Sequence, residues 1–334
     1  MWRGFIIVVG AFAVITSVAD PLHDPFDNRQ VDTRLWDQSL IEATQIDFDT
    51  LGRCGRGAIV VTARAGEGVK DCDNRLCQRL ELREKHRRNF GEDVWYSFSF
   101  KVEGDVPTSS VVPHWVLAQW KEETDQSPFV AQRFGNGVFQ ITVEDNGVRR
   151  LIASSRATPA QIDVFHKTVD TLGKKETLNL TNIARELRAL EKNTTTETQY
   201  QALVNKLLPP NLAAESLNLW REFDFLTDPE LYAGPSSVVI EPGPHPILPD
   251  PTLGWVDMRY HIRGDTNGGA RVQVWANDTL VVTATGSIGH KIHAGPTQYF
   301  KFGHYRDVLP GTVRLLFDEF RRGSTEAQVK SACP

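Results

Sequence analysis

The side chains most suited to catalysis or ligand binding lie near the C-terminus, in the run Tyr-Phe-Lys-Phe-Gly-His-Tyr-Arg at 299–306. Aromatic and polar residues alternate here, and this alternation predicts a β-strand. Because successive strand side chains point to opposite faces, one face carries two phenols, an ammonium group and a glycine. Such a face can line a groove, exchange protons with a substrate and neutralise its negative charge, although an ordinary half-exposed strand shows the same pattern. This face consists of Tyr299, Lys301, Gly303 and Tyr305, and the opposite face consists of Phe300, Phe302 and His304.

Two further stretches carry charged or amide groups at the same two-residue spacing. Alternation places Arg79, Glu81 and Arg83 on one strand face, where a carboxylate between two guanidinium groups would hold a rigid cationic surface. A solvated ladder of ion pairs is the alternative. Gln119 and Lys121 also share a face, so an amide and an ammonium group could together bind a carboxylate.

Three motifs follow one another along the chain: Arg-x-Glu-x-Arg, then Gln-Trp-basic residue, then Tyr-Phe-Lys-x-Gly-x-Tyr. With these motifs in this order, the chain resembles the polysaccharide lyases with a β-jelly-roll fold. The heparin lyase I-like and glucuronan lyase-like group is the most similar, and the alginate lyases are more distant. The resemblance covers about 27–152 and 238–320. It implies β-elimination at a uronic acid, without an organic cofactor or a catalytic metal ion. This chemistry needs a group that neutralises the C5 carboxylate, a base for the C5 proton and an acid for the O4 leaving group.

The resemblance also assigns expected roles. Tyr305 would protonate O4, alone or together with a separate base, and Lys301 would lower the pKa of Tyr305 and hold substrate charge. Gln119 would bind the carboxylate. The expected catalytic residues are Tyr305, Gln119, Lys121 and Lys301. The expected substrate-binding residues are Arg79, Glu81, Arg83, Tyr299, His114 and Arg259.

One departure from the family pattern concerns the base. Relatives commonly carry His where this chain has Lys121, and a lysine can replace it only if burial or nearby cations lower its pKa. Otherwise Tyr305 works alone or another histidine substitutes. Alternation places His114 and His304 on the apolar side of their strands, where a histidine is more often a packed core residue. A non-catalytic carbohydrate-binding or envelope protein on the same scaffold is therefore the alternative function. The candidate histidines are His114, His261, His290, His293 and His304.

The remaining sequence predicts an all-β fold with one helical insertion. The chain has 334 residues, 40% of them hydrophobic, and a net charge of −5, which disfavours nucleic-acid binding. Strand patterns with turn signals between them fill the chain before and after a helical stretch, and 234–254 is a Pro/Gly-rich linker. We therefore expect a β-jelly-roll (concanavalin-like) sandwich. Its segments are a signal peptide at 1–19, the sandwich at 20–153 plus 236–334, and the insertion with its linker at 154–235.

The N-terminus and the cysteines predict a secreted or periplasmic protein. Arg3, an apolar run and small residues up to Ala19 form a signal-peptide pattern, with an uncleaved anchor as the alternative. The four cysteines fit structural disulfides better than zinc, because no Cys-x-x-Cys spacing occurs. Three pairings are open, including one between Cys72 and Cys77 with Cys54 and Cys333 left to pair. The expected partner is an acidic polysaccharide, bound by a monomer.

Overall fold

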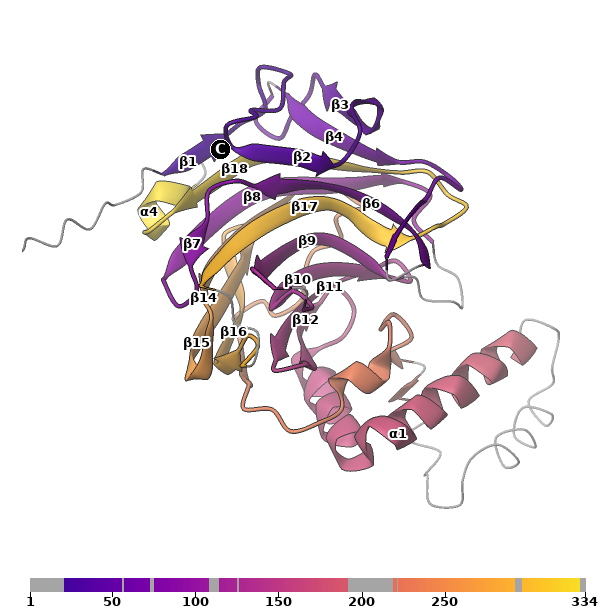
Figure 1. Ribbon diagram of the computed structural model, residues 1–334. Coiled ribbons are helices and arrows are strands. Elements are labelled where there is room, and N and C mark those ends of the chain that lie inside the picture. Colours follow the sequence, from indigo (N-terminus) through magenta and orange to yellow (C-terminus); the bar gives the residue numbers. More distant parts are fainter. Residues whose placement is uncertain are drawn as a thin grey trace, which may run out of the picture.

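The computed structural model describes residues 21–55, 57–72, 75–107, 114–124, 126–191, 219–220, 222–291 and 296–330, with the side chains of 69–75 and 185–191 left undescribed. The expected signal peptide lies outside these residues. Two antiparallel sheets of nine strands each pack face to face (Figure 1). The protein is thus a β-sandwich with an added helical segment, as the sequence predicted.

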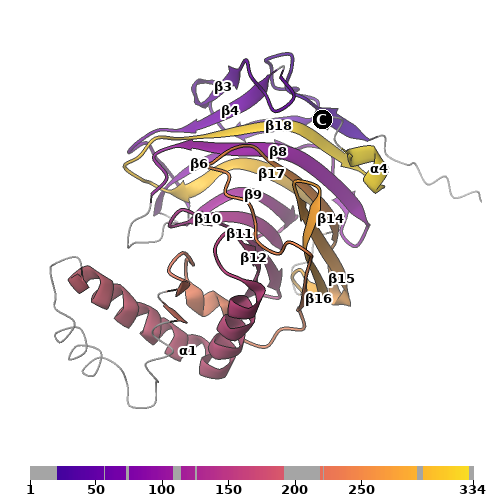
Figure 2. The same cartoon turned by 180° about the vertical axis from the view of Figure 1, so that it is seen from behind.

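The first sheet lies at the back in Figure 1 and at the front in Figure 2, where the sandwich is seen from behind. Its hydrogen-bonded order is β13-β16-β15-β14-β8-β18-β4-β3, and β1 pairs with β18. The strand bounds are β1 Leu22–Asp24, β3 Ile46–Asp49, β4 Ala58–Ala63, β8 Val94–Gly104, β13 Val239–Pro242, β14 Val256–Arg263, β15 Asp265–Ala276, β16 Thr279–Ile288 and β18 Val313–Gly323.

The second sheet carries all three of the motifs singled out above. Its order is β12-β11-β10-β9-β17-β6-β2, so the three motif strands β9, β17 and β6 are direct neighbours although they are far apart in the sequence. Strand β5 pairs with β6, and β7 pairs with β17. The bounds are β2 Trp36–Leu40, β5 Val69–Cys72, β6 Arg75–Glu84, β7 Arg88–Asn89, β9 Trp115–Glu122, β10 Val130–Gly135, β11 Val138–Asp145, β12 Val148–Ser154 and β17 Thr297–Asp307.

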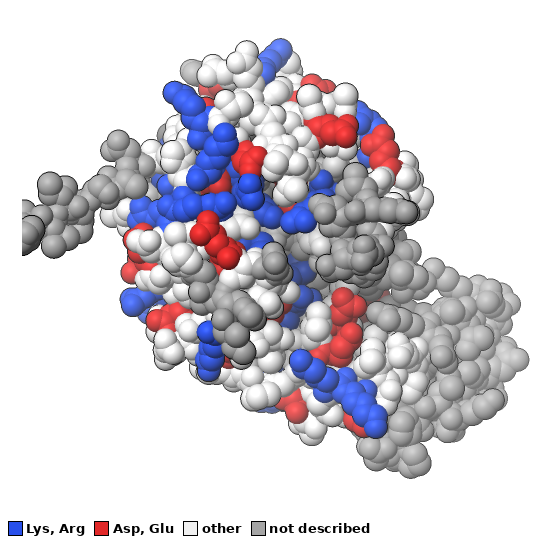
Figure 3. All heavy atoms as spheres, in the orientation of Figure 1, with Lys and Arg blue, Asp and Glu red and all other residues white. Residues whose placement is uncertain are grey.

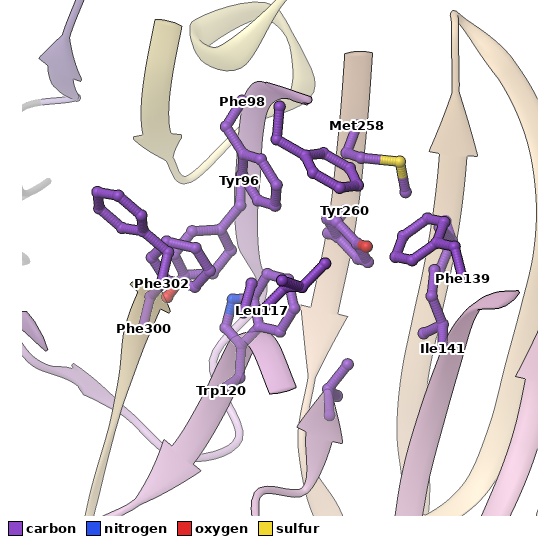
Figure 4. Close-up of a cluster of buried hydrophobic side chains, with 14 of the residues drawn as sticks. Tyr96, Phe98, Leu117, Trp120, Phe139, Ile141, Met258, Tyr260, Phe300 and Phe302 are labelled. Carbon is purple, nitrogen blue, oxygen red and sulfur yellow. The ribbon is translucent and has the colours of Figure 1, made fainter. Parts of the chain in front are cut away.

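Aromatic side chains from both sheets fill the space between them (Figure 4). Phe300 and Phe302 of β17 are fully buried there, and the ring of Phe302 stacks on Phe317 of β18 at a centroid distance of 3.8 Å. Burial of each such side chain stabilises the fold by about 1.5–3 kcal/mol. This burial fixes the register of β17, because a shift by one residue would turn the phenylalanines outward. The polar residues of the strand are therefore held on the outer face of the second sheet.

The helical segment follows β12 and packs on the outer face of the second sheet at its β11–β12 end. Helix α1 (Pro159–Glu191) contains a break at Gly173, whose φ is 74°. A second hydrophobic cluster joins Phe165 of this helix to Leu151 of β12 and to Tyr232. Tyr232 ends a short 3-10 helix, η2 (Pro229–Tyr232). The other short helices are η1 Ala43–Gln45 and α4 Glu326–Val329.

Two details differ from the expectations. The supposed linker contains β13, which extends the first sheet by pairing with β16. The run Asn267-Gly268-Gly269, which the sequence predicts as a turn between two strands, is instead an irregularity inside β15, where the register with β16 shifts between Asp265 and Ala270. The sequence misled in both places because Pro and Gly occur at edge strands and bulges as well as in turns. Within the insertion, the sequence also predicts helices at 200–208 and 212–225 from the spacing of apolar residues; the first and most of the second lie outside the described residues.

Candidate active site

The outer face of the second sheet brings the three motifs together through strand register. Lys301 of β17 lies directly opposite Arg83 of β6 on one side and Gln119 of β9 on the other. Two residues further along β17, Gly303 lies opposite Glu81. Cross-strand neighbours of this kind have Cβ atoms about 5 Å apart, so these side chains form one continuous surface.

Glu81 connects the functional groups of all three strands. Its carboxylate accepts a hydrogen bond from Nε2 of Gln119, one from Nε of Arg79 at 3.3 Å, and it pairs with Nζ of Lys301 at 3.7 Å. Glu81 is 2% exposed. The alternative of a solvated ladder is thus wrong: the carboxylate is buried and holds an amide and two cations in fixed positions.

Lys301 is a buried cation beneath this surface. It is 2% exposed, and burial lowers its pKa below the ordinary lysine value, while the carboxylate of Glu81 opposes that change. Its Nζ lies 5.7 Å from the ring centroid of Tyr299. Burial also raises the pKa of Tyr299, which Arg87 covers at 3.8 Å from the ring centroid. Tyr299 is therefore held as a neutral phenol at the side of Lys301.

Tyr305 lies between a guanidinium and an imidazole. It is opposite Arg79 in register, and the guanidinium carbon of Arg79 is 5.2 Å from its ring centroid. The ring of His114 meets that of Tyr305 edge to face, with the centroids 4.8 Å apart and the planes at 71°. The cation in contact with Tyr305 is thus Arg79, whereas Lys301 lies with Glu81 and Tyr299.

The position of His114 corrects the sequence prediction. Simple alternation placed it on the core side, opposite to Gln119. The register of β9 shifts against both neighbouring strands, so both Leu117 and Ala118 pack into the core and Val116 lies opposite Tyr305. This irregularity reverses the alternation and turns His114 to the face of Tyr305.

The other candidate bases lie elsewhere. His304 is fully buried in the core, where its Nδ1 accepts a hydrogen bond from Trp115 and its pKa is lowered to about 3. His290 is buried against Glu122, with Nδ1 and Oε2 2.6 Å apart. His261 belongs to the first sheet and pairs with Asp93. Of the candidate histidines that the structure describes, His114 is the one with a ring contact to Tyr305, and His293 lies outside the described residues.

The cationic residues at the edges of the site have their own partners. Arg83 is held by Asp37 of β2 and not by Glu81, a contact that the sequence could not reveal because the two positions are 46 residues apart. Lys121 is half-buried and lies opposite Tyr299. Figure 3 shows the resulting band of lysine and arginine side chains across the face over β6 and β17.

Arg259 does not belong to this group. It lies on β14 of the first sheet, where it pairs with Asp278 at 2.6 Å and with Glu326 at 3.4 Å. Its guanidinium carbon is 5.0 Å from the ring centroid of Trp275. Arg259 thus lies on the other sheet from the remaining candidates, which two-residue alternation could not reveal, and its role in substrate binding stays a prediction.

Gly303 is required by packing rather than by substrate. Its φ is 136°, and a Cβ at this position would lie 1.9 Å from the carbonyl oxygen of Leu80. The close approach that the glycine permits is thus that of strand β6, which places Glu81 next to β17. The glycine acts on the site indirectly, by allowing this contact.

Sequence reasoning missed one arginine on the same face. Arg133 of β10 lies opposite Val116, in the row that also contains Tyr305 and Arg79. Strand alternation could have identified Arg133, because it places Ala131 and Arg133 on the face opposite to that of the hydrophobic Phe134. Among the described residues, no group of three or more His, Cys, Asp or Glu is arranged to hold a metal ion.

The comparisons with known proteins agree with the class of enzyme that these motifs indicate. A sequence model described as polysaccharide lyase matches residues 31–205, more than half of the chain. The chain therefore belongs to the polysaccharide lyase family, and it is an enzyme of this type. A search of curated proteins gave no match.

Several solved structures are similar to the chain at low identity. Endo-β-1,4-glucuronan lyase from the fungus Trichoderma reesei has 12% identity and a TM-score of 0.48, with 92% of this chain and 97% of that chain covered. An alginate lyase of polysaccharide lyase family 7 has 14% identity and a TM-score of 0.42, with 84% of each chain covered. The cellulose-induced protein Cip1 has 12% identity and a TM-score of 0.40, with 91% and 97% covered.

Proposed function

We propose that the enzyme cleaves an acidic, uronate-containing polysaccharide by β-elimination, with His114 as the base and Tyr305 as the acid. The contact between these two rings is the observation that carries the proposal. His114 would take the proton from C5, the C4–O4 bond would break as a C4–C5 double bond forms, and the Tyr305 hydroxyl would protonate O4. Imidazole suits the base role because it ordinarily titrates at about pH 6.5.

Arg79 supports the role assigned to Tyr305. A guanidinium beside a phenol stabilises the phenolate, so a proton leaves the hydroxyl more easily. Arg79 is itself held by Glu81, which keeps the guanidinium against the ring before the substrate binds. Such preorganised charge lowers the barrier without rearrangement during the reaction.

The carboxylate of the reacting sugar would bind between Gln119, Lys301 and Lys121. Gln119 and Lys301 are adjacent in register, and Lys121 follows on the same face. Their positive and hydrogen-bonding groups would neutralise the C5 carboxylate and so make the C5 proton acidic. Arg83 would bind the carboxylate of a neighbouring sugar. Glu81 would position the other groups, because its oxygens are already occupied by them.

We further propose that the protein is exported, as the N-terminal pattern indicates. The state of the cysteines supports this proposal: Cys54 and Cys77 are disulfide-bonded and not free thiols. Disulfides of this kind persist in oxidising compartments. The side chains of Cys72 and Cys333 lie outside the described residues, so the pairing stays a prediction. No helix among the described residues is long and apolar enough to cross a membrane.

The product of β-elimination provides the test. The unsaturated uronate absorbs in the ultraviolet, whereas hydrolysis leaves no such chromophore. Purified protein would be incubated with glucuronan, alginate and a heparin-type polymer, in parallel with the Tyr305→Phe variant. A rise in absorbance with one polymer that the variant abolishes is the expected result. Cleavage without a chromophore would contradict the elimination mechanism.

A further inference from the structure

Arg133 is a nearly buried guanidinium without a counter-charge. It is 5% exposed, and its Nε donates to Oγ1 of Thr142 at 3.0 Å. Its two terminal nitrogens form no hydrogen bond or ion pair with any residue that the structure describes. Arg149, its neighbour, differs in this respect: Nε of Arg149 pairs with Glu144 at 3.1 Å.

An unpaired buried cation lowers the stability of a fold, because the charge loses its hydration without gaining a partner. The lowered pKa of Arg133, about 10, reflects this unfavourable environment of the charge. Burial is the larger cause, and the charge of Arg149 is the second. Glu144 and Asp228 are the nearby acids that oppose this change, and neither forms an ion pair with Arg133. A destabilising group of this kind indicates a function, because packing alone favours an apolar side chain at the position.

One hydrogen bond fixes the orientation of the guanidinium on the outer face. Thr142 lies opposite Ala131, and Ala131 lies opposite Gln119. Thr142 belongs to β11, so the hydrogen bond from Nε holds the guanidinium on the β11 side of β10, level with the row that contains Gln119 and Lys301.

Arg133 and Arg79 stand on opposite sides of Tyr305. Three strand spacings separate their strands, which corresponds to about 14 Å. This span suits a short run of sugar units laid across the strands, with the reacting sugar at Tyr305. Tyr232 of η2 lies near Arg133 and is 1% exposed, so the inserted segment closes this end of the face.

We propose that Arg133 forms a second carboxylate subsite, which binds a uronate on the β10 side of the reacting sugar beneath the inserted segment. This inference rests on the proposed function and adds the position of a further negative charge on the substrate. The two terminal nitrogens of one guanidinium match the two oxygens of a carboxylate, which a lysine would not. The substrate thus supplies the counter-charge that the protein lacks.

The test compares Arg133→Met with Arg149→Met, a matched change at a paired arginine of the same cluster. Binding of long and short oligomers of glucuronan and alginate would be measured by calorimetry on the Tyr305→Phe background, together with the unfolding temperature. Arg133→Met should weaken binding of the long oligomers about 10- to 100-fold and leave the shortest unaffected. It should also raise the unfolding temperature by about 2 °C or more, whereas Arg149→Met should lower it.

The outcomes separate this inference from the proposed function. If the parent protein binds neither polymer and cleaves none of the three polymers named above, the proposed function fails. If the parent binds one of the polymers and Arg133→Met binds oligomers of every length with the affinity of the parent, the subsite is refuted. An unfolding temperature that falls in Arg133→Met, with unchanged affinity, would show a structural arginine and overturn the inference. Arg133→Lys keeps the charge but loses the two-pronged geometry, and it should lie between parent and Arg133→Met in affinity.

Discussion

His114 and Tyr305 meet edge to face at 4.8 Å because β9 carries an irregularity between Val116 and Ala118. The backbone holds the pair in place: the amide of His114 donates to the Asp307 carboxylate at 2.8 Å, and the amide of Asp307 donates to the His114 carbonyl at 3.0 Å. This pairing ties the start of β9 to the end of β17. The imidazole thus reaches the phenol although the family position for histidine is occupied by Lys121.

Replacement of His114 by Gln should lower kcat about 10²- to 10⁴-fold and leave KM nearly unchanged, because the amide removes the base without emptying the site. The initial rate of ultraviolet absorbance measures the effect. His23→Gln is a suitable control, since His23 pairs with Glu319 on the first sheet. Full activity in His114→Gln would assign the base to Lys121 or to Tyr305 alone.

Replacement of Gly303 by Ala should destabilise the fold by at least about 3 kcal/mol, because it adds a clash with the Leu80 carbonyl to an unfavourable φ. Gly147→Ala separates the two effects: its φ is 84°, but nothing lies within 4 Å of the added Cβ. That control should cost only about 1–2 kcal/mol. Urea unfolding followed by circular dichroism gives both values, and equal losses would disprove the role of the clash.

Most of the face around Tyr305 could be predicted from the sequence because regular strands obey a period of two. Phe300 and Phe302 anchor one side of β17 in the core, so Lys301 and Tyr305 must lie on the other. Glu81 follows the same rule on β6. These positions depend only on local alternation, and local alternation is encoded in adjacent residues.

The rest depends on relationships between distant segments, which local patterns do not encode. The position of His114 depends on a register shift, and the partner of Arg83 is Asp37 on an edge strand. Arg259 has the right spacing but belongs to the other sheet. Arg133 gains its importance from the inserted segment that buries it, and no feature of its own strand indicates that burial.

The pH dependence of stability should carry a signature of His304, whose pKa in the folded protein is about 3. In the unfolded chain an imidazole titrates near about 6.5, so between these values only the unfolded state binds the proton. The contribution of the neutral His304 to the free energy of unfolding is thus fully present above about pH 6.5. It falls as the pH decreases below that value, by up to about 1.4 kcal/mol per pH unit. His304→Gln should lack this dependence.

The measurement must be a difference between parent and variant, because other groups act in the opposite direction. Glu84 and Asp318 have pKa values raised to about 7, so they take up protons in the folded state and stabilise it as the pH falls. Chemical unfolding of parent and His304→Gln between pH 7 and 5 would be compared. A difference in stability that stays constant over this range would contradict a neutral, buried His304.

Removal of the charge on Glu81 should destabilise the protein mainly through Lys301. Glu81→Gln leaves a 2% exposed ammonium group without its carboxylate, at a cost of about 3 kcal/mol. Lys301→Met alone should also destabilise, since it removes one partner of Glu81. The double variant should be more stable than the sum of the two losses predicts, because neither charge is then left uncompensated. Urea unfolding of the four proteins gives this coupling, and strictly additive losses would show that Arg79, not Lys301, is the main partner of Glu81.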